Sequence, residues 1–198
     1  MNDEVKKICE IYDRKERFRK IDDLLSRHKV FLNDIMDYYT SNVSFKTIDF
    51  AVYYLDRGIN IRRIEDAVAS SGDLFCMFLF AKNIEVSNID RFTDITIASR
   101  NNWYIFLYAR NIKGVNIAKL EDATIESLDG PSIYSFAKNV KGANVVKLHD
   151  GMLKTGDREY MYYFDRDIMG YSQDILMRDY GSLFEDDKNN VKVKEKRI

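Results

Sequence analysis

The chain has 198 residues, with 31 Lys and Arg against 32 Asp and Glu, and its net charge of -1 gives no overall field that would draw it to nucleic acid or a membrane. Hydrophobic residues make up 45% of the sequence, which excludes wholesale disorder, and no apolar run is long enough to span a bilayer. Two cysteines, Cys9 and Cys76, provide neither a disulfide framework nor a CxxC metal site, and a single proline favours helix. We therefore expect an all-α, soluble, cytoplasmic protein.

The N-terminal part of the chain is predicted to be helical and to cap the rest. Residues 1–32 are expected to form charged capping helices, and residues 33–60 a first, degenerate helical hairpin. Ser44 is placed to cap the second helix of that hairpin. One apolar stripe of the capping helices is expected to contain Val5, Ile8, Cys9 and Tyr12.

A repeat occupies residues 61–172. Its period is 28 residues without a gap, and the units are 61–88, 89–116, 117–144 and 145–172. The sixth position of every unit is an aspartate: Asp66, Asp94, Asp122 and Asp150. The twentieth position is always aromatic: Phe80, Tyr108, Phe136 and Phe164. Residues 61–172 are therefore interpreted as four copies of one structural unit.

Each unit is predicted to form two helices. An asparagine before the unit is placed to cap the first helix, and the acid or amide at position 13 is placed to cap the second. Glycines end most of these helices, although Arg100 and Leu128 replace the glycine after the first helix in two units. Short connections make the two helices antiparallel neighbours. Since one hairpin cannot bury its apolar stripe alone, we expect an α-solenoid of stacked antiparallel helical hairpins with a helical N-terminal cap.

The last full unit and the residues after it depart from the pattern. Asp165 stands where the other units have a small alanine, which suggests a looser or terminal stack. Residues 173–184 are expected to form a C-terminal capping helix, and residues 185–198 a disordered tail because they are charged and nearly free of apolar side chains.

The runs Phe136–Asn144 (FAKNVKGAN) and Lys119–Ala123 (KLEDA) resemble a short helical-repeat family found in uncharacterised phage, viral and low-GC bacterial proteins. The resemblance covers roughly residues 48–172 and implies an α-hairpin array of microbial or phage origin. It carries no catalytic motif. The general logic is similar to that of tetratricopeptide- and ankyrin-type solenoids, but the 28-residue period matches neither.

The sequence contains no recognisable set of catalytic residues. His149 occupies a repeat position held elsewhere by Glu65, Thr93 and Glu121, so we expect a solvated helix residue and not a general base. Cys76 is expected to be a packed thiol. The repeated aspartates are expected to cap helices or to bond between repeats, in preference to binding a metal. No catalytic residue, cofactor or metal site is therefore predicted, and an enzyme is the least favoured class.

Nucleic-acid binding remains the alternative function. Four of the five units from residue 33 onward net -1 or -2, and only 89–116 nets +2, so the array has little of the asymmetry that a phosphate-binding groove needs. We therefore rank nucleic acid below protein as a partner, and expect no membrane partner.

Positions 15 and 19 of the repeat carry the candidate binding residues. Both point away from the apolar stripe of the second helix, yet two adjacent units have large apolar side chains there, and these are Phe75, Leu79, Trp103 and Leu107. Arg100 and Arg110 flank them, and Trp103 is the only tryptophan. Because tryptophan and arginine dominate interface hot spots, we interpret these six residues as a partner-binding ridge. The competing interpretation is that they pack against neighbouring repeats or the N-terminal helices.

These observations predict a non-enzymatic, protein-binding repeat scaffold. The phage resemblance implies a partner such as a host enzyme or a defence complex, which binding would block or redirect. Self-association through the same ridge is left open.

Overall fold

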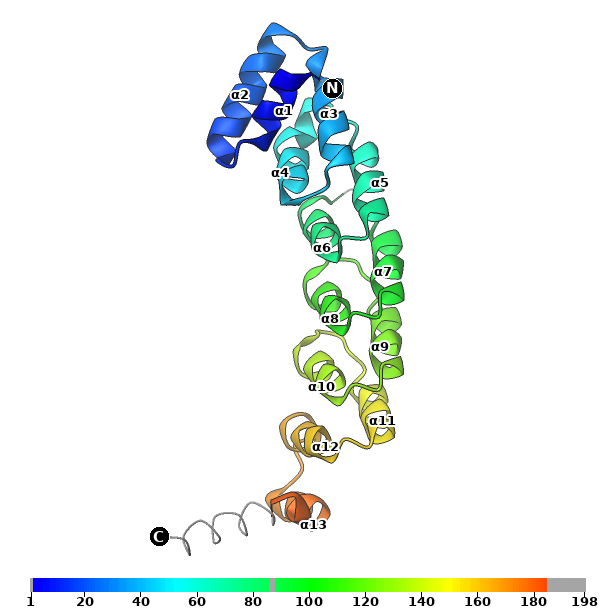
Figure 1. Cartoon of the computed structure of the whole chain (residues 1–198). Helices are drawn as coiled ribbons and strands as arrows, with labels where there is room; N and C mark the ends of the chain where they lie inside the picture. Colours follow the sequence, from blue (N-terminus) through cyan, green and yellow to red (C-terminus); the bar gives the residue numbers. More distant parts are fainter. Residues whose placement is uncertain (1, 86–87, 185–198) are drawn as a thin grey trace, which may run out of the picture. The chain divides into compact units, whose positions relative to one another are not determined.

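The computed structural model describes residues 2–85 and 88–184, apart from the side chain of Phe184. Within these residues every regular element is helical, thirteen of the elements are α-helices, and no strand is present (Figure 1). The predicted all-α class is therefore confirmed. No helix of the described part is long and apolar enough to cross a bilayer. The tail expected at 185–198 lies outside the described residues.

Two compact units divide the chain, Met1–Ile95 and Thr96–Ile198. The helix α7 (Ile89–Ala98) crosses the boundary between them. The other elements of the first unit are α1 (Asp3–Glu10), α2 (Arg14–Arg27), α3 (Phe31–Ser41), α4 (Phe45–Tyr54), the 3-10 turn η1 (Leu55–Arg57), α5 (Ile61–Ser71) and α6 (Leu74–Asn83).

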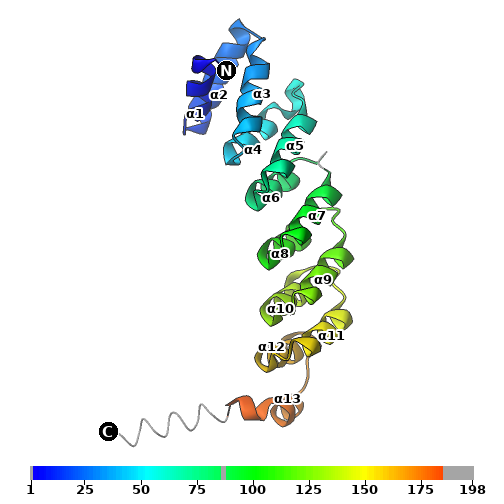
Figure 2. The ribbon, with the colours of Figure 1, turned by 45° about the vertical axis from the view of Figure 1, so that its right-hand side comes forward.

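Apolar faces hold the first unit together. The helix α1 packs against α2 and α3, α3 also packs against α4 and α5, and α4 packs against α5 and α6 (Figure 2). Buried side chains at helical spacing on these elements form the core, and they include Val5, Cys9, Ile21, Leu24, Ile35, Phe50, Ile64 and Phe80. Tyr12 is not among them: α1 ends at Glu10, and Tyr12 is 84% exposed, so its predicted place on the apolar stripe is wrong.

A fully buried arginine fixes the turn between α1 and α2. One terminal nitrogen of Arg17 donates to the carbonyls of Ile11 (2.9 Å) and Tyr12 (3.3 Å), and the other donates to the Asp49 carboxylate on α4 (3.0 Å). A buried cation is tolerated only when it is paired and hydrogen-bonded, and this one has both kinds of partner. The sequence analysis did not single out Arg17, because it stands among many charged residues of a surface-like helix.

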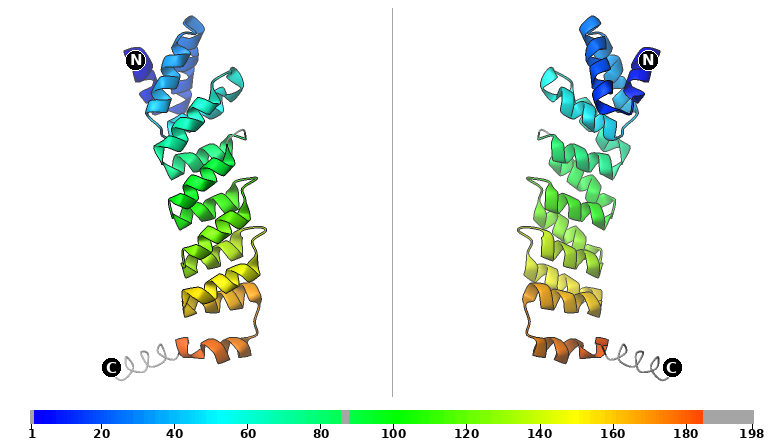
Figure 3. Two further views of the ribbon diagram at one scale, coloured as in Figure 1. Left: turned by 90° about the vertical axis from the view of Figure 1, so that its right-hand side faces the viewer. Right: turned by 90° about the vertical axis from the view of Figure 1, so that its left-hand side faces the viewer.

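The second unit contains α8 (Asn102–Asn111), α9 (Ile117–Glu126), α10 (Gly130–Asn139), α11 (Val145–Thr155), α12 (Arg158–Phe164), the π-helical turn η2 (Asp165–Met169), α13 (Gln173–Tyr180) and the 3-10 turn η3 (Gly181–Phe184). The central helix α10 packs against α8 and α12, which lie above and below it in Figure 1, and against α9 and α11, which lie to its right. The helix α13, drawn in orange to red in Figure 3, contacts α12.

The predicted helix starts are confirmed at atomic detail. The side chains of Asn88, Asn116 and Asn144 each accept a hydrogen bond from the backbone N–H three residues later. The turns that follow α7 and α9 are less usual. Their residues Arg100 and Leu128 adopt a left-handed backbone, with φ of 53° and 52°, where the other two units use glycine. An L side chain is strained in that region by roughly 1–2 kcal/mol.

Asp165 organises the C-terminal end of the second unit, where the sequence suggested a looser stack. The residue is only 3% exposed and begins η2. Its carboxylate accepts a hydrogen bond from the Tyr180 hydroxyl (2.5 Å) and contacts Nε2 of His149 at 2.9 Å. Burial and this hydrogen bond raise the pKa of Tyr180. The expectation that His149 is solvated is therefore wrong, since its side chain is only 17% exposed and faces a buried acid.

The same repeat position is buried in other units. Glu65 and Glu121 are 8% and 2% exposed, and each carboxylate accepts the backbone N–H of the asparagine that caps the next first helix, at 3.1 Å from Asn88 and 2.7 Å from Asn144. These glutamates bond α5 to the start of α7 and α9 to the start of α11, and they are not solvent-facing residues.

Candidate functional site

The predicted ridge residues of the first unit lie on α6. Phe75 is 50% exposed and Leu79 is half-buried, one helical turn further along. Beneath them Phe78 is buried, and the Lys82 ammonium lies 5.7 Å from the centre of its ring. The side chain of Asp73 caps the start of this helix by accepting from the backbone N–H groups of the second and third residues.

The ridge residues of the second unit lie on α8 and form a more strongly exposed group. Trp103 is 63% exposed, and Leu107 is half-buried one turn away. The Trp103 ring lies 6.0 Å from the buried ring of Phe106, and the Arg110 guanidinium lies 5.9 Å from the centre of that same ring. We call Trp103, Phe106, Leu107 and Arg110 the α8 face, because their spacing of three and four residues places them on one side of the helix.

Arg100 lies next to the α8 face, in the turn between α7 and α8. Its exposed side chain lines a hollow of about 650 Å³, together with Asn102, Ile105, Ala123, Glu126 and Ser127. The hollow has one cation and one carboxylate in its lining. From α8 it takes only Asn102 and Ile105, and no residue of the α8 face lines it.

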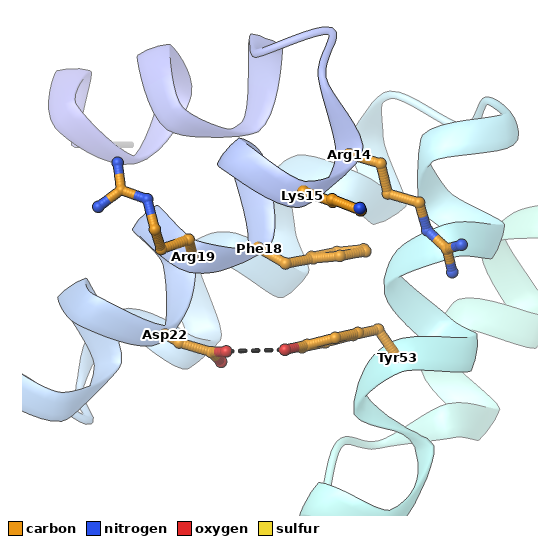
Figure 4. A pocket seen from close by; sticks show the side chains of 6 residues that line it. All are labelled: Arg14, Lys15, Phe18, Arg19, Asp22 and Tyr53. Atoms are coloured by element: carbon orange, nitrogen blue, oxygen red, sulfur yellow. Dashed lines mark hydrogen bonds between the residues drawn. The ribbon is translucent and has the colours of Figure 1, made fainter.

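A second concave site, which sequence reasoning missed, lies in the first unit. Figure 4 shows a pocket of about 500 Å³ whose lining brings α2 side chains together with Tyr53 of α4. Phe18 stacks on Tyr53 with ring centres 4.2 Å apart. The other lining residues are Arg14, Lys15, Arg19 and Asp22.

Hydrogen bonds within this pocket fully engage its one acid. The Asp22 carboxylate accepts from the hydroxyls of Tyr53 (2.9 Å) and Tyr54 (2.6 Å) and pairs with Arg57 (2.8 Å). Burial and this contact raise the pKa of Tyr54. No local motif could have revealed the pocket, since the residues that meet there come from helices separated along the chain. The arrangement ties α2 to α4, and Lys15 and Arg19 border it without an ion pair to any described acid.

The structure also shows the surroundings of the cysteine and the aspartates that the sequence analysis considered as nucleophile or metal ligands. Cys76 is 1% exposed, and burial raises the pKa of its thiol from 9.0 to about 12, so the predicted packed thiol is confirmed. Asp66 of α5 pairs with Arg91 of α7 (2.5 Å) and Asp122 of α9 pairs with Lys147 of α11, so each of these two aspartates joins two helices. Within residues 2–85 and 88–184, no three His, Cys, Asp or Glu side chains converge to hold a metal ion.

Comparison with known proteins finds no match to the chain in protein families, curated proteins or solved structures.

Proposed function

We propose that the chain is a non-enzymatic, protein-binding α-solenoid, built of stacked antiparallel helical hairpins behind a helical N-terminal cap. The helix starts support the repeat: α5, α7, α9 and α11 begin at residues 61, 89, 117 and 145, and α6, α8, α10 and α12 begin at 74, 102, 130 and 158. Both series have the spacing of the sequence repeat. The buried glutamates that receive the next repeat's capping N–H support the same architecture.

The exposed indole of Trp103 carries the binding proposal. A tryptophan buries more apolar surface than almost any other side chain when it is covered, and here it stands 63% exposed beside Leu107. Exposed aromatic and arginine side chains are the usual composition of an interface hot spot. Phe75 and Leu79 give α6 a similar exposed pair. If the resemblance to phage repeat proteins holds, the partner is a host enzyme or defence complex in the cytoplasm.

The test is affinity capture from nuclease-treated microbial lysate with a tagged full-length chain. The variant Phe75→Asp/Trp103→Asp removes the exposed aromatic groups of both helices. A matched control, Val146→Asp/Leu153→Asp, changes two apolar residues of α11 that are 67% and 58% exposed. Circular dichroism establishes that all three proteins are equally helical.

The proposal expects a protein that the wild type and the α11 control retain and the aromatic variant loses. Equal retention by all three proteins contradicts it. Loss of every retained protein on nuclease treatment, without any effect of the substitutions, favours nucleic-acid binding instead.

A further inference from the structure

The residues around α8 carry an unbalanced positive charge. Between Asp94 and Glu121 the sequence contains no acidic residue, but it contains three cations that concern this surface: Arg100, Arg110 and Lys113. Within the described residues, Arg100, Arg110 and Lys113 form no ion pair with a carboxylate. Among the other cations of the same unit, Lys138 and Arg166 pair with Asp167, and Lys147 pairs with Glu121 and Asp122. Lys141 and Lys154, like the cations around α8, pair with no described acid.

A local structural role explains only part of this charge. Arg110 lies in the last turn of α8, where a cation complements the helix dipole, and Lys82 and Lys138 occupy the corresponding places on α6 and α10. The dipole does not account for Lys113, which lies beyond the helix, or for the missing acids on either side. Arg110 therefore shares one side of α8 with the exposed Trp103 and the half-buried Leu107, and Lys113 follows in the turn after the helix.

We propose that the α8 face binds an acidic segment of a partner protein, with apolar anchors on Trp103 and Leu107 and carboxylates at Arg110 and Lys113. This inference rests on the proposed protein-binding function and adds the chemistry of the partner. Complementary charge at the edge of an interface steers association and fixes its register, whereas the buried apolar centre supplies most of the affinity.

The positions along α8 determine how such a segment lies. Trp103, Leu107 and Arg110 follow one another at steps of four and three residues, so the anchors and the first cation share a side of the helix. Contact with the Phe106 ring holds the Arg110 guanidinium near that side. At the N-terminal end of α8, Glu126 lines the same hollow as Arg100, and its negative charge weakens the positive potential there. The carboxylates of the partner are therefore assigned to the C-terminal end of α8.

The chain provides a built-in probe, because Trp103 is its only tryptophan and all indole fluorescence reports this surface. The first measurement compares quenching of that fluorescence by iodide and by caesium at low ionic strength. A positive local potential raises the ratio of iodide to caesium quenching above the ratio for free N-acetyltryptophanamide, and added salt removes this excess. A ratio at low salt no higher than that of the free derivative overturns the proposal.

The second measurement uses a synthetic helical peptide of about four turns with leucines one turn apart and glutamates elsewhere, and the same peptide with lysines in place of the glutamates. We expect the glutamate peptide to shift Trp103 emission to the blue and the lysine peptide to leave it unchanged. The variant Arg110→Glu/Lys113→Glu should bind the glutamate peptide about tenfold more weakly, since it reverses two contact charges. A control with the same charge change, Lys141→Glu/Lys154→Glu, should bind as the wild type does.

Binding of neither peptide, equal binding of both, or tighter binding of a single-stranded oligonucleotide overturns the acidic-partner proposal. The experiments also distinguish the acidic-partner proposal from the general proposal that the chain binds a protein. A captured protein that Trp103→Asp loses but Arg110→Glu/Lys113→Glu retains would refute the acidic chemistry while leaving the protein-binding function in place.

Discussion

Replacing Glu121 tests how α9 is joined to the start of α11. Its carboxylate is 2% exposed, accepts the backbone N–H of Asn144 at 2.7 Å, and lies 3.4 Å from the Lys147 ammonium. In Glu121→Ala the Asn144 N–H loses a charged acceptor, and a hydrogen bond to a charged group contributes about 1.5–3 kcal/mol. We therefore expect the free energy of unfolding to fall by about 2 kcal/mol, which is a large share of a typical domain's stability.

The assay is urea denaturation followed both by circular dichroism and by Trp103 fluorescence. Glu126 of the same helix is exposed, and Glu126→Ala is the matched control, with an expected change within about 0.5 kcal/mol. Glu121→Gln keeps a carbonyl oxygen for the Asn144 N–H and should lose less than Glu121→Ala. If Glu121→Ala is no less stable than Glu126→Ala, the glutamate does not join the repeats and the reasoning fails.

Two further predictions concern backbone strain and a buried thiol. Leu128→Gly should raise the free energy of unfolding by about 0.5–1 kcal/mol, because glycine removes the strain of the left-handed backbone at φ 52° and the Leu128 side chain, 55% exposed, loses little packing. The control Leu128→Ala should not stabilise the protein. An equal gain in stability from both substitutions in urea denaturation would contradict this explanation. Because burial raises the pKa of Cys76 from 9.0 to about 12, its contribution to stability is complete below pH 9 and is lost as the pH rises from 9 toward 12. Comparing unfolding of the wild type and Cys76→Ala across that range measures it, and a wild-type loss no larger than the variant's would argue against a buried neutral thiol.

The sequence predicted local structure well at positions where a residue type strongly favours one structural role. An asparagine before an apolar period is such a signal, and Asn88, Asn116 and Asn144 cap the helices as expected. Trp103 and Phe75 also lie exposed on the side of the helix opposite the apolar stripe. Their part in binding stays a prediction.

Polar residues with partners far along the chain could not be predicted in the same way. Glu121 and His149 share a repeat position that varies between polar residue types, which is also the pattern of a solvated site. Only the structure shows that Glu121 accepts the backbone N–H of Asn144 at the start of α11, and that His149 faces Asp165. Arg17 is similar, since the acceptors that make its burial possible are backbone carbonyls and Asp49 on another helix. Hydrophobic periodicity has no signal for such contacts.

The most direct test of the proposed function is acrylamide quenching of Trp103 with and without the protein captured from lysate. Because this single tryptophan is 63% exposed, the account predicts that the bound partner lowers the quenching constant and shifts the emission to the blue. An unchanged quenching constant at saturating partner would show that the α8 face is not the surface that binds.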